Sequence, residues 1–254
     1  TVPSGSGKST LAETVLYRHF ARKFGDLDAG PAGEATISGG EHITSAVLVD
    51  QSPLGRTARG NTATYTKAWD RIRQIFAKQA TTQGSRLEAK HFSFNVAGGR
   101  CETCSGEGFE TVEMQFLADV QLLCPVCQGK RFREEVLAIH YRDKTVADVL
   151  AMTVDEASTL FAEDPATVKA LQPARAVGLG YVQLGQPLST LSGGEAQRLK
   201  LARALSEKAK NTLFVIDEPS AGLHSSDAEH VITALHDLVK EGASVVVVEH
   251  DLDV

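Results

Sequence analysis

The sequence has few of the features that mark membrane proteins, secreted scaffolds or disordered chains. Aromatic residues make up 6% of the 254 residues, and only one of them is a tryptophan. The longest purely aliphatic run is Val245–Val248, whereas a membrane-spanning helix needs about 20 apolar residues; we therefore expect no membrane insertion. No signal peptide is recognisable, so we expect a cytoplasmic protein. The hydrophobic share of 42% and the charged share of 23% exclude general disorder and are typical of a globular protein.

Positive charge is also scarce over the chain as a whole, but not in every part of it. The formal net charge of −6 excludes a uniformly basic nucleic-acid binder. Between residues 51 and 100, however, nine basic residues stand against two acidic ones. Such a segment suits salt-sensitive contacts to the phosphates of double-stranded DNA, although a solvated helical face over residues 67–78 is the alternative. The candidate DNA contacts are Arg56, Arg59, Lys67 and Arg100.

Cysteine is restricted to two Cys-x-x-Cys pairs, Cys101 with Cys104 and Cys124 with Cys127. Four thiolates at this spacing suit tetrahedral zinc, and the glycines after each pair fit tight turns. Two disulfides or redox motifs are the alternatives. Both require an oxidising compartment or a thioredoxin-like frame, and the sequence shows neither. We therefore expect one structural Zn²⁺ site in a module over about residues 92–133.

The chain starts with most of a phosphate-binding loop. The candidate residues are Ser4, Gly5, Ser6, Gly7, Lys8, Ser9 and Thr10. Glycines let backbone N–H groups approach phosphates, Lys8 supplies a cation, and the Ser9 hydroxyl can bind Mg²⁺. A turn followed by a helix N-cap is the alternative. The full pattern needs glycine at position 2, where this chain has Val2; a β-branched residue tolerates unusual backbone angles poorly, so we expect weaker nucleotide affinity.

Three short aliphatic segments read as strands: Ala46–Val49, Leu213–Ile216 and Val245–Val248. They alternate with helical patterns over residues 195–210 and 227–240, which predicts an α/β fold with a parallel sheet. Each strand ends in polar residues that can act on a nucleotide.

The polar residues after these strands suggest a hydrolytic site. Asp217 is a candidate Mg²⁺ ligand, and Glu218 is a candidate to polarise the attacking water. His250 could reach a γ-phosphate, although a strand-end histidine is more often an ordinary surface residue.

The segment Leu191–Arg198, with sequence LSGGEAQR, opens a helix at two glycines and makes an anion-receptive N-terminus. With the preceding motifs it resembles the ATP-binding cassette (ABC) family. The resemblance assigns Ser4–Thr10 to Walker A, Gln51 to the Q-loop, Leu191–Arg198 to the signature, Leu213–Asp217 to Walker B, Glu218 to the catalytic carboxylate, Ser220–His224 to the D-loop and His250 to the H-loop. It implies Mg²⁺ bound by Ser9, Gln51 and Asp217.

The same resemblance implies that ATP is held between Walker A of one cassette and the signature of another. The signature residues concerned are Ser192, Gly193, Gly194 and Glu195. A second cassette, either a tandem half or the other chain of a homodimer, is therefore an expected partner. Residues 1–51 and 191–254 would form the ATP-binding core, and residues 52–190 an inserted subdomain with the zinc module.

Three further segments, at residues 49–66, 92–101 and 177–186, resemble the UvrA family. This family is the DNA-damage-recognising ATPase of bacterial nucleotide excision repair, part of the excision nuclease, with two tandem cassettes and zinc-bearing insertions. The resemblance places this chain in the second cassette and implies a UvrB-like partner bound through an N-terminal half that this chain lacks. The alternatives are a UvrA-like protein for resistance to DNA-binding drugs, a regulatory half with little turnover, and a transporter cassette, which would not need the cysteines.

Overall fold

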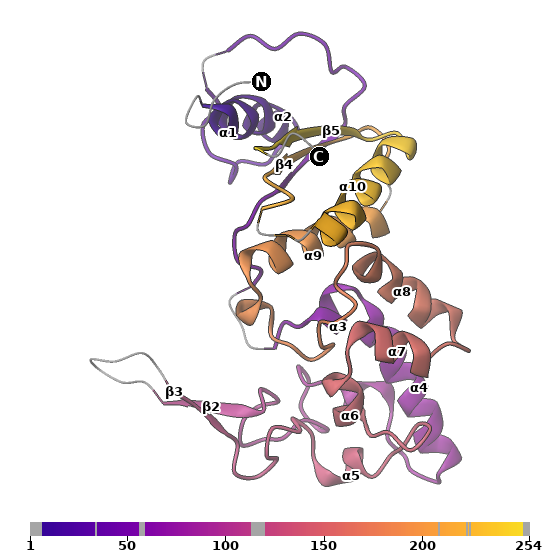
Figure 1. The fold of residues 1–254 in the computed structure, drawn as a ribbon. Helices are drawn as coiled ribbons and strands as arrows, with labels where there is room; N and C mark the ends of the chain where they lie inside the picture. Colours follow the sequence, from indigo (N-terminus) through magenta and orange to yellow (C-terminus); the bar gives the residue numbers. More distant parts are fainter. Residues whose placement is uncertain are drawn as a thin grey trace. The chain divides into compact units, whose positions relative to one another are not determined.

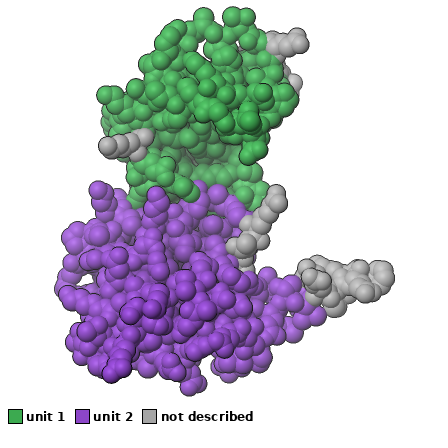
Figure 2. Space-filling model, turned by 180° about the vertical axis from the view of Figure 1, so that it is seen from behind, with its two compact units in different colours: residues 1–53, 173–179, 191–254 green, residues 54–172, 180–190 purple. Residues whose placement is uncertain are grey.

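The structure, a computed structural model, describes residues 7–33, 35–55, 59–112, 120–207, 209–221, 223 and 225–250. The chain forms two compact units (Figure 2). Unit 1 comprises residues 1–53, 173–179 and 191–254, and unit 2 comprises residues 54–172 and 180–190. Within the described residues, no helix combines the length and the apolar composition needed to cross a membrane.

Unit 1 contains a parallel sheet of β1 (Ser45–Val49), β4 (Thr212–Asp217) and β5 (Ser244–Val248), in the order β1-β4-β5. The three predicted strands are therefore confirmed, each with one or two residues added. Val49 pairs with Ile216, and Asp217 pairs with Val248, so all three strands end at the same edge. This register brings together the polar residues that follow each strand.

Helices cover both faces of this sheet (Figure 1). On one face lies a continuous helical segment made of α1 (Lys8–Thr10), η1 (Leu11–Tyr17) and α2 (Arg18–Lys23), which contacts β1 and β4. On the other lie α9 (Gly193–Ser206), which contacts β1, and α10 (Ser225–Lys240), which contacts β5. The two predicted helices are confirmed, although α9 ends before the expected residue 210.

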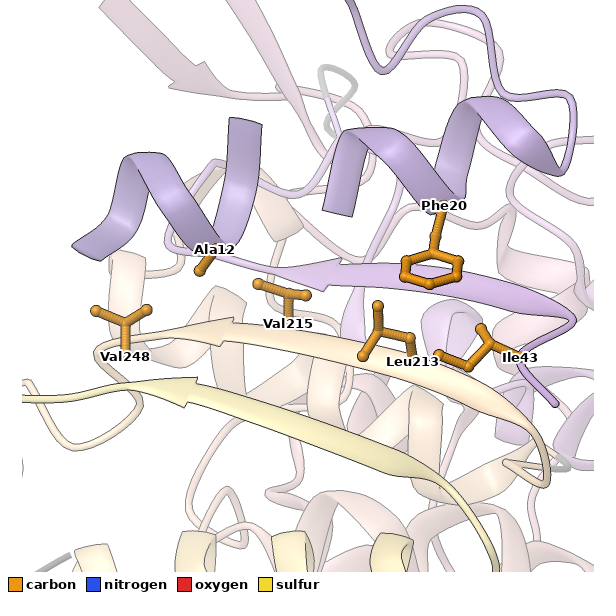
Figure 3. Close-up of a cluster of buried hydrophobic side chains, with 6 residues drawn as sticks. All are labelled: Ala12, Phe20, Ile43, Leu213, Val215 and Val248. Atoms are coloured by element: carbon orange, nitrogen blue, oxygen red, sulfur yellow. The ribbon is translucent and has the colours of Figure 1, made fainter. Parts of the chain in front are cut away.

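The core of unit 1 lies between the first helical segment and the sheet. Figure 3 shows Ala12 and Phe20 pointing from the helices toward the strands. The buried cluster consists of Ala12, Phe20, Ile43, Leu213, Val215 and Val248. Because side chains alternate along a strand, Phe214 and Ile216 face the opposite side, and they are buried as well. A strand buried on both faces explains the uninterrupted aliphatic sequence of β4.

The helical segment after the phosphate loop contains a wider turn than an α-helix. Residues Leu11–Tyr17 form a π-helix, in which N–H groups donate to the carbonyl five residues earlier in the chain. The Leu11 side chain is 64% exposed, whereas Ala12 is buried. The wider turn aligns Ala12 with Tyr17, five residues on, and both pack on the cluster.

The described residues of unit 2 form short helices and one antiparallel hairpin. The helices are α3 (Thr62–Tyr65), α4 (Ala68–Thr82), η2 (Ala89–Phe92), α5 (Glu134–Leu137), α6 (Val146–Ala151), α7 (Val154–Leu160), the first part of α8 (Pro165–Ala176) and η3 (Leu188–Thr190). The antiparallel hairpin joins β2 (Phe109–Val112) to β3 (Val120–Leu123), and its strands are largely exposed. The helices α6 and α7 are each opened by a threonine capping box.

The core of unit 2 is aromatic. Five phenylalanine side chains are fully buried: Phe76, Phe92, Phe94, Phe132 and Phe161. The rings of Phe76 and Phe92 lie 5.6 Å apart, and those of Trp69 and Phe94 lie 5.5 Å apart. Offset and tilted contacts of this kind hold short helices together where the strands are too few to provide a sheet core.

Candidate functional site

The first element of the candidate nucleotide site joins two segments 208 residues apart in sequence. The Ser9 hydroxyl donates a hydrogen bond to Asp217 Oδ1 over 3.1 Å. Gly7, with φ of 84°, turns the chain into the helix that carries Lys8, Ser9 and Thr10. A hydroxyl and a carboxylate this close are suitable oxygen ligands for Mg²⁺. Ser4, Gly5, Ser6 and Val2 lie outside the described residues.

The second element pairs the two polar residues expected to act on the γ-phosphate. His250 Nε2 lies 2.9 Å from Glu218 Oε1. The backbone of Glu218 has φ of 48°, a left-handed conformation that is uncommon outside glycine and is often found at functional sites. Its N–H donates to the Val248 carbonyl over 2.8 Å. The ends of β4 and β5 therefore fix both the position and the direction of this carboxylate.

The third element is Gln51, which follows β1 and lies against the start of α9. A Cβ atom built on Gly193 would lie 3.3 Å from Gln51 Cβ, so a larger residue at 193 would press on the glutamine. Ser192 and Glu195 form a capping box: the Glu195 N–H donates to the Ser192 hydroxyl, and the Ser192 N–H donates to the Glu195 carboxylate. Ser192 is exposed, and a Cβ atom on Gly194 would meet no atom within 4 Å. The signature residues thus form an accessible helix N-terminus.

Sequence reasoning missed the residue that joins these elements. Gln197 is 3% exposed, and its side-chain amide donates to the carbonyl of Val49 over 3.2 Å and to the carbonyl of Asp217. It therefore links the ends of β1 and β4. Gln197 lies on the same helical face as Leu201, four residues further on, and this position could have indicated a buried polar side chain. Ser220, whose hydroxyl donates to the Glu249 carboxylate, makes a similar link that the sequence did not indicate.

The four cysteines of unit 2 are brought together as the spacing predicted. Their sulfur atoms all lie within 4.8 Å of one another, and none forms a disulfide. Cys101 Sγ is 3.9 Å from Cys124 Sγ, and Cys104 Sγ is 3.6 Å from Cys127 Sγ. Four sulfurs at about 2.3 Å from a tetrahedral Zn²⁺ would lie about 3.8 Å apart. The donor set and its dimensions fit a closed structural zinc site.

The turns around these cysteines have the geometry that the glycines suggested. Gly106 has φ of 86°, and a Cβ atom there would lie 2.4 Å from the Phe94 carbonyl oxygen. The Gly108 N–H donates to Cys104 Sγ over 3.2 Å. A hydrogen bond from the backbone of Cys127 lowers the pKa of Cys124 to about 7, whereas burial raises the pKa of Cys127 to about 12. Backbone N–H groups thus already favour a thiolate at one of the four positions.

Comparison with known proteins decides the family. A family model described as "ABC transporter" matches residues 119–221. UvrABC system protein A of Aquifex aeolicus is 50% identical over 252 residues, which cover 99% of this chain and 27% of that protein. The Thermus thermophilus protein of the same name is 49% identical over 255 residues, covering 100% of this chain and 27% of the relative. The crystal structure of UvrA2 from Deinococcus radiodurans matches with a TM-score of 0.89 and 48% identity, over 99% of this chain and 30% of that one. The chain belongs to the UvrA family of ATP-binding cassette proteins.

The similarity to UvrA proteins covers the whole of unit 2, whereas the general cassette match leaves out its first part. The cassette model starts only at residue 119, whereas the UvrA relatives are similar over almost the whole chain, including residues 54–118. The predicted α/β cassette fold is confirmed by the UvrA2 structure. The chain spans about a quarter (27%) of the length of the UvrA-family relatives it matches.

The candidate DNA-contacting residues lie in unit 2. Arg59 Nε is 3.4 Å from Glu107 Oε1, and Arg100 donates to the Asn95 carbonyl over 3.2 Å. Lys67 opens α4 with φ of 63°, and Arg56 lies outside the described residues. Three other cations of the basic segment form ion pairs: Arg71 with Asp164, Arg73 with Asp70 and Lys90 with Glu88. These pairs reduce the positive charge that the sequence count alone would place on this surface.

Proposed function

We propose that this chain is the second nucleotide-binding cassette of a UvrA-type ATPase, and that the protein uses ATP to recognise DNA damage in nucleotide excision repair. The observation that carries the proposal is the meeting of Ser9 with Asp217 and of Glu218 with His250 at one edge of the sheet. Relatives that are 48–50% identical over at least 99% of the chain support it.

In this proposal the residues divide the chemistry of ATP hydrolysis among them. Lys8 and the N-terminus of the first helix bind the phosphates. Ser9, Asp217 and Gln51 hold Mg²⁺, which neutralises charge on the phosphate oxygens when bound. Glu218 accepts a proton from the attacking water. His250 holds the Glu218 carboxylate and faces the γ-phosphate.

The accessible signature helix supports a partner cassette. Ser192, Gly193, Gly194 and Glu195 would bind the triphosphate held by Walker A of a second cassette, either a tandem half or a second copy. In the whole protein, a UvrB-like repair partner would bind through the N-terminal half that the family resemblance implies.

The role proposed for unit 2 is to contact double-stranded DNA. Zn²⁺ held by Cys101, Cys104, Cys124 and Cys127 would keep the module folded, since four thiolates leave no open coordination position. Arg56, Arg59, Lys67 and Arg100 would contact phosphates. Damage would then be read from the shape and deformability of the duplex rather than from base edges.

The decisive experiment measures ATP hydrolysis by the full-length protein with damaged and with intact duplex, over salt from about 50 to 200 mM. We expect stronger stimulation by the damaged duplex and a steep loss of stimulation as salt rises. A Lys8→Ala variant supplies the background rate. Hydrolysis that responds to neither duplex would contradict the DNA-linked function, and equal stimulation by both would contradict damage recognition.

A further inference from the structure

Lys200, on the signature helix α9, lies over the turn that carries Gln51. Its ammonium nitrogen is 3.0 Å from the Asp50 carbonyl, 2.9 Å from the Ser52 carbonyl and 2.7 Å from the Ser52 hydroxyl. It also bonds to the Asp50 carboxylate. The Lys200 side chain is 15% exposed, so these contacts largely replace water. One ammonium thus contacts residues on both sides of Gln51.

The turn beneath Lys200 is closed by its own hydrogen bonds. The Ser52 hydroxyl donates to the Asp50 carboxylate over 2.6 Å, and the Ser52 N–H donates to the same oxygen over 3.3 Å. Asp50 also pairs with the ammonium of Lys200 across this turn, so one carboxylate links the turn to α9.

Two other residues of α9 reach the same region. Gly193 lies against Gln51, and the Gln197 amide bonds to the carbonyls that end β1 and β4. Positions 193, 197 and 200 follow one face of the helix, since they are four and seven residues apart. Gly193 gives only a close approach, and Gln197 holds the strand ends. Lys200 donates hydrogen bonds to both residues that flank Gln51.

We propose that Lys200 is a positioning residue of the nucleotide site, which fixes the Asp50–Ser52 turn on the signature helix and so holds Gln51 at the strand ends. The inference rests on the proposed function in one respect, because it takes Gln51 to serve bound Mg²⁺ and nucleotide. It assigns a role in that site to a lysine outside the cassette motifs.

The test replaces Lys200 with methionine in the full-length protein, which keeps the length of the side chain and removes the charge. Lys240→Met is the matched control, because Lys240 also pairs with an aspartate, Asp237, but is 74% exposed on α10. Without nucleotide, we expect hydrogen exchange of the Asp50–Ser52 amides to rise about tenfold in Lys200→Met, since charge-assisted bonds are lost there. Exchange in β4 should stay as in the wild type. The Mg²⁺ concentration for half-maximal ATP hydrolysis should also rise about tenfold.

The Asp50→Asn variant tests whether Lys200 acts through its pair with Asp50 or whether its loss disturbs the structure in general. If Lys200 acts through this turn, the double variant Asp50→Asn with Lys200→Met should be little worse than either single variant. Unchanged exchange at Asp50–Ser52, exchange raised equally in β4, or fully additive effects would each overturn the proposal. A wild-type protein that hydrolyses no ATP would contradict the proposed function instead, and the exchange comparison would still decide whether Lys200 holds the turn.

Discussion

The two units of this chain solve the same problem, the burial of enough apolar surface, in different ways. Unit 1 has an aliphatic core on parallel strands, which includes Leu213, Val215 and Val248. Unit 2 has a hairpin with exposed strands, and its largest buried side chains are phenylalanines around short helices. It also contains four buried cysteines. A sheet needs no metal to hold its layers, whereas a region of short helices and turns gains from a cross-link.

The units differ equally in how their sites arise. Ser9 and Asp217 meet because parallel strands from distant parts of unit 1 end at one edge. The cysteines of unit 2 come from two local turns within 27 residues of sequence. A substitution of a chemical group in the site made by tertiary packing should remove activity and leave the fold intact. A substitution in the site made by local turns should remove binding and also destabilise the local fold. The predictions below test that contrast.

The largest effect is expected from the zinc site. Cys101→Ser should abolish stoichiometric zinc binding and destabilise unit 2 by more than about 5 kcal/mol, because metal binding and folding are coupled in such modules. Metal analysis and hydrogen exchange of residues 99–112 and 120–133 provide the measurement, with Thr103→Ser in the same turn as control. Protection of β4 in unit 1 should persist. Wild-type protein without zinc would rule out the metal site.

Glu218→Gln should leave folding intact and act on chemistry alone. We expect hydrolysis to fall by about 10²- to 10⁴-fold with ATP still bound, because the amide cannot accept the proton of the attacking water. Single-turnover hydrolysis and nucleotide retention measure this, with Glu241→Gln on the surface of unit 1 as the control. Turnover at the wild-type rate would exclude Glu218 as the base.

Core truncations should sharpen the contrast between aromatic and aliphatic packing. Phe76→Ala in unit 2 should destabilise by about 4 kcal/mol, and Leu213→Ala in unit 1 by about 3 kcal/mol. The single tryptophan, Trp69, lies in the aromatic core of unit 2, so its fluorescence follows that unit. In denaturant titrations Phe76→Ala should shift the fluorescence transition more than Leu213→Ala does. A larger shift of the transition in Leu213→Ala would contradict the assignment of Trp69 to the same core as Phe76.

The smallest effect concerns an ion pair on the surface of unit 2. The hydrogen bond from Arg71 lowers the pKa of Asp164 to about 2, and the N–H of Thr167 also donates to this carboxylate. Because the folded pKa is depressed, the stabilisation is present above about pH 4 and is lost as pH falls toward 2. Asp164→Asn should lower the free energy of unfolding by about 1 kcal/mol at pH 7. The difference from wild type should shrink as pH falls toward 2 and vanish below it, which urea titrations at pH 7 and at low pH can check.

Much of the candidate site could be predicted from the sequence because its parts have strong local patterns. The strand ending in Asp217 and Glu218 and the paired cysteines each combine residue type with a short fixed spacing. Gln197 and Lys200 have no such pattern. A glutamine and a lysine on a helix are ordinary residues until the fold shows which carbonyls and carboxylates they reach.

For the basic segment, the sequence indicates a property that the tertiary structure then reduces. Counting charges suggests a positive surface, but Arg71 and Arg73 form ion pairs with Asp164 and Asp70. Asp164 lies more than 90 residues from Arg71, so composition within a window could not include it. The number of charges is a property of the sequence, whereas their neutralisation depends on which segments pack together.

The sequence by itself determined the α/β class, the three strands, the cysteine pairs and the family resemblance, because each depends on residues close together in the chain. Only the tertiary structure decided that Ala12 and not Leu11 is buried, that Glu218 adopts a left-handed backbone beside His250, and that α9 holds the ends of β1 and β4. These features depend on a π-helical turn, on the register of the strands and on a buried helix face, respectively. Their energies depend on contacts between segments up to 208 residues apart, which no local pattern can specify.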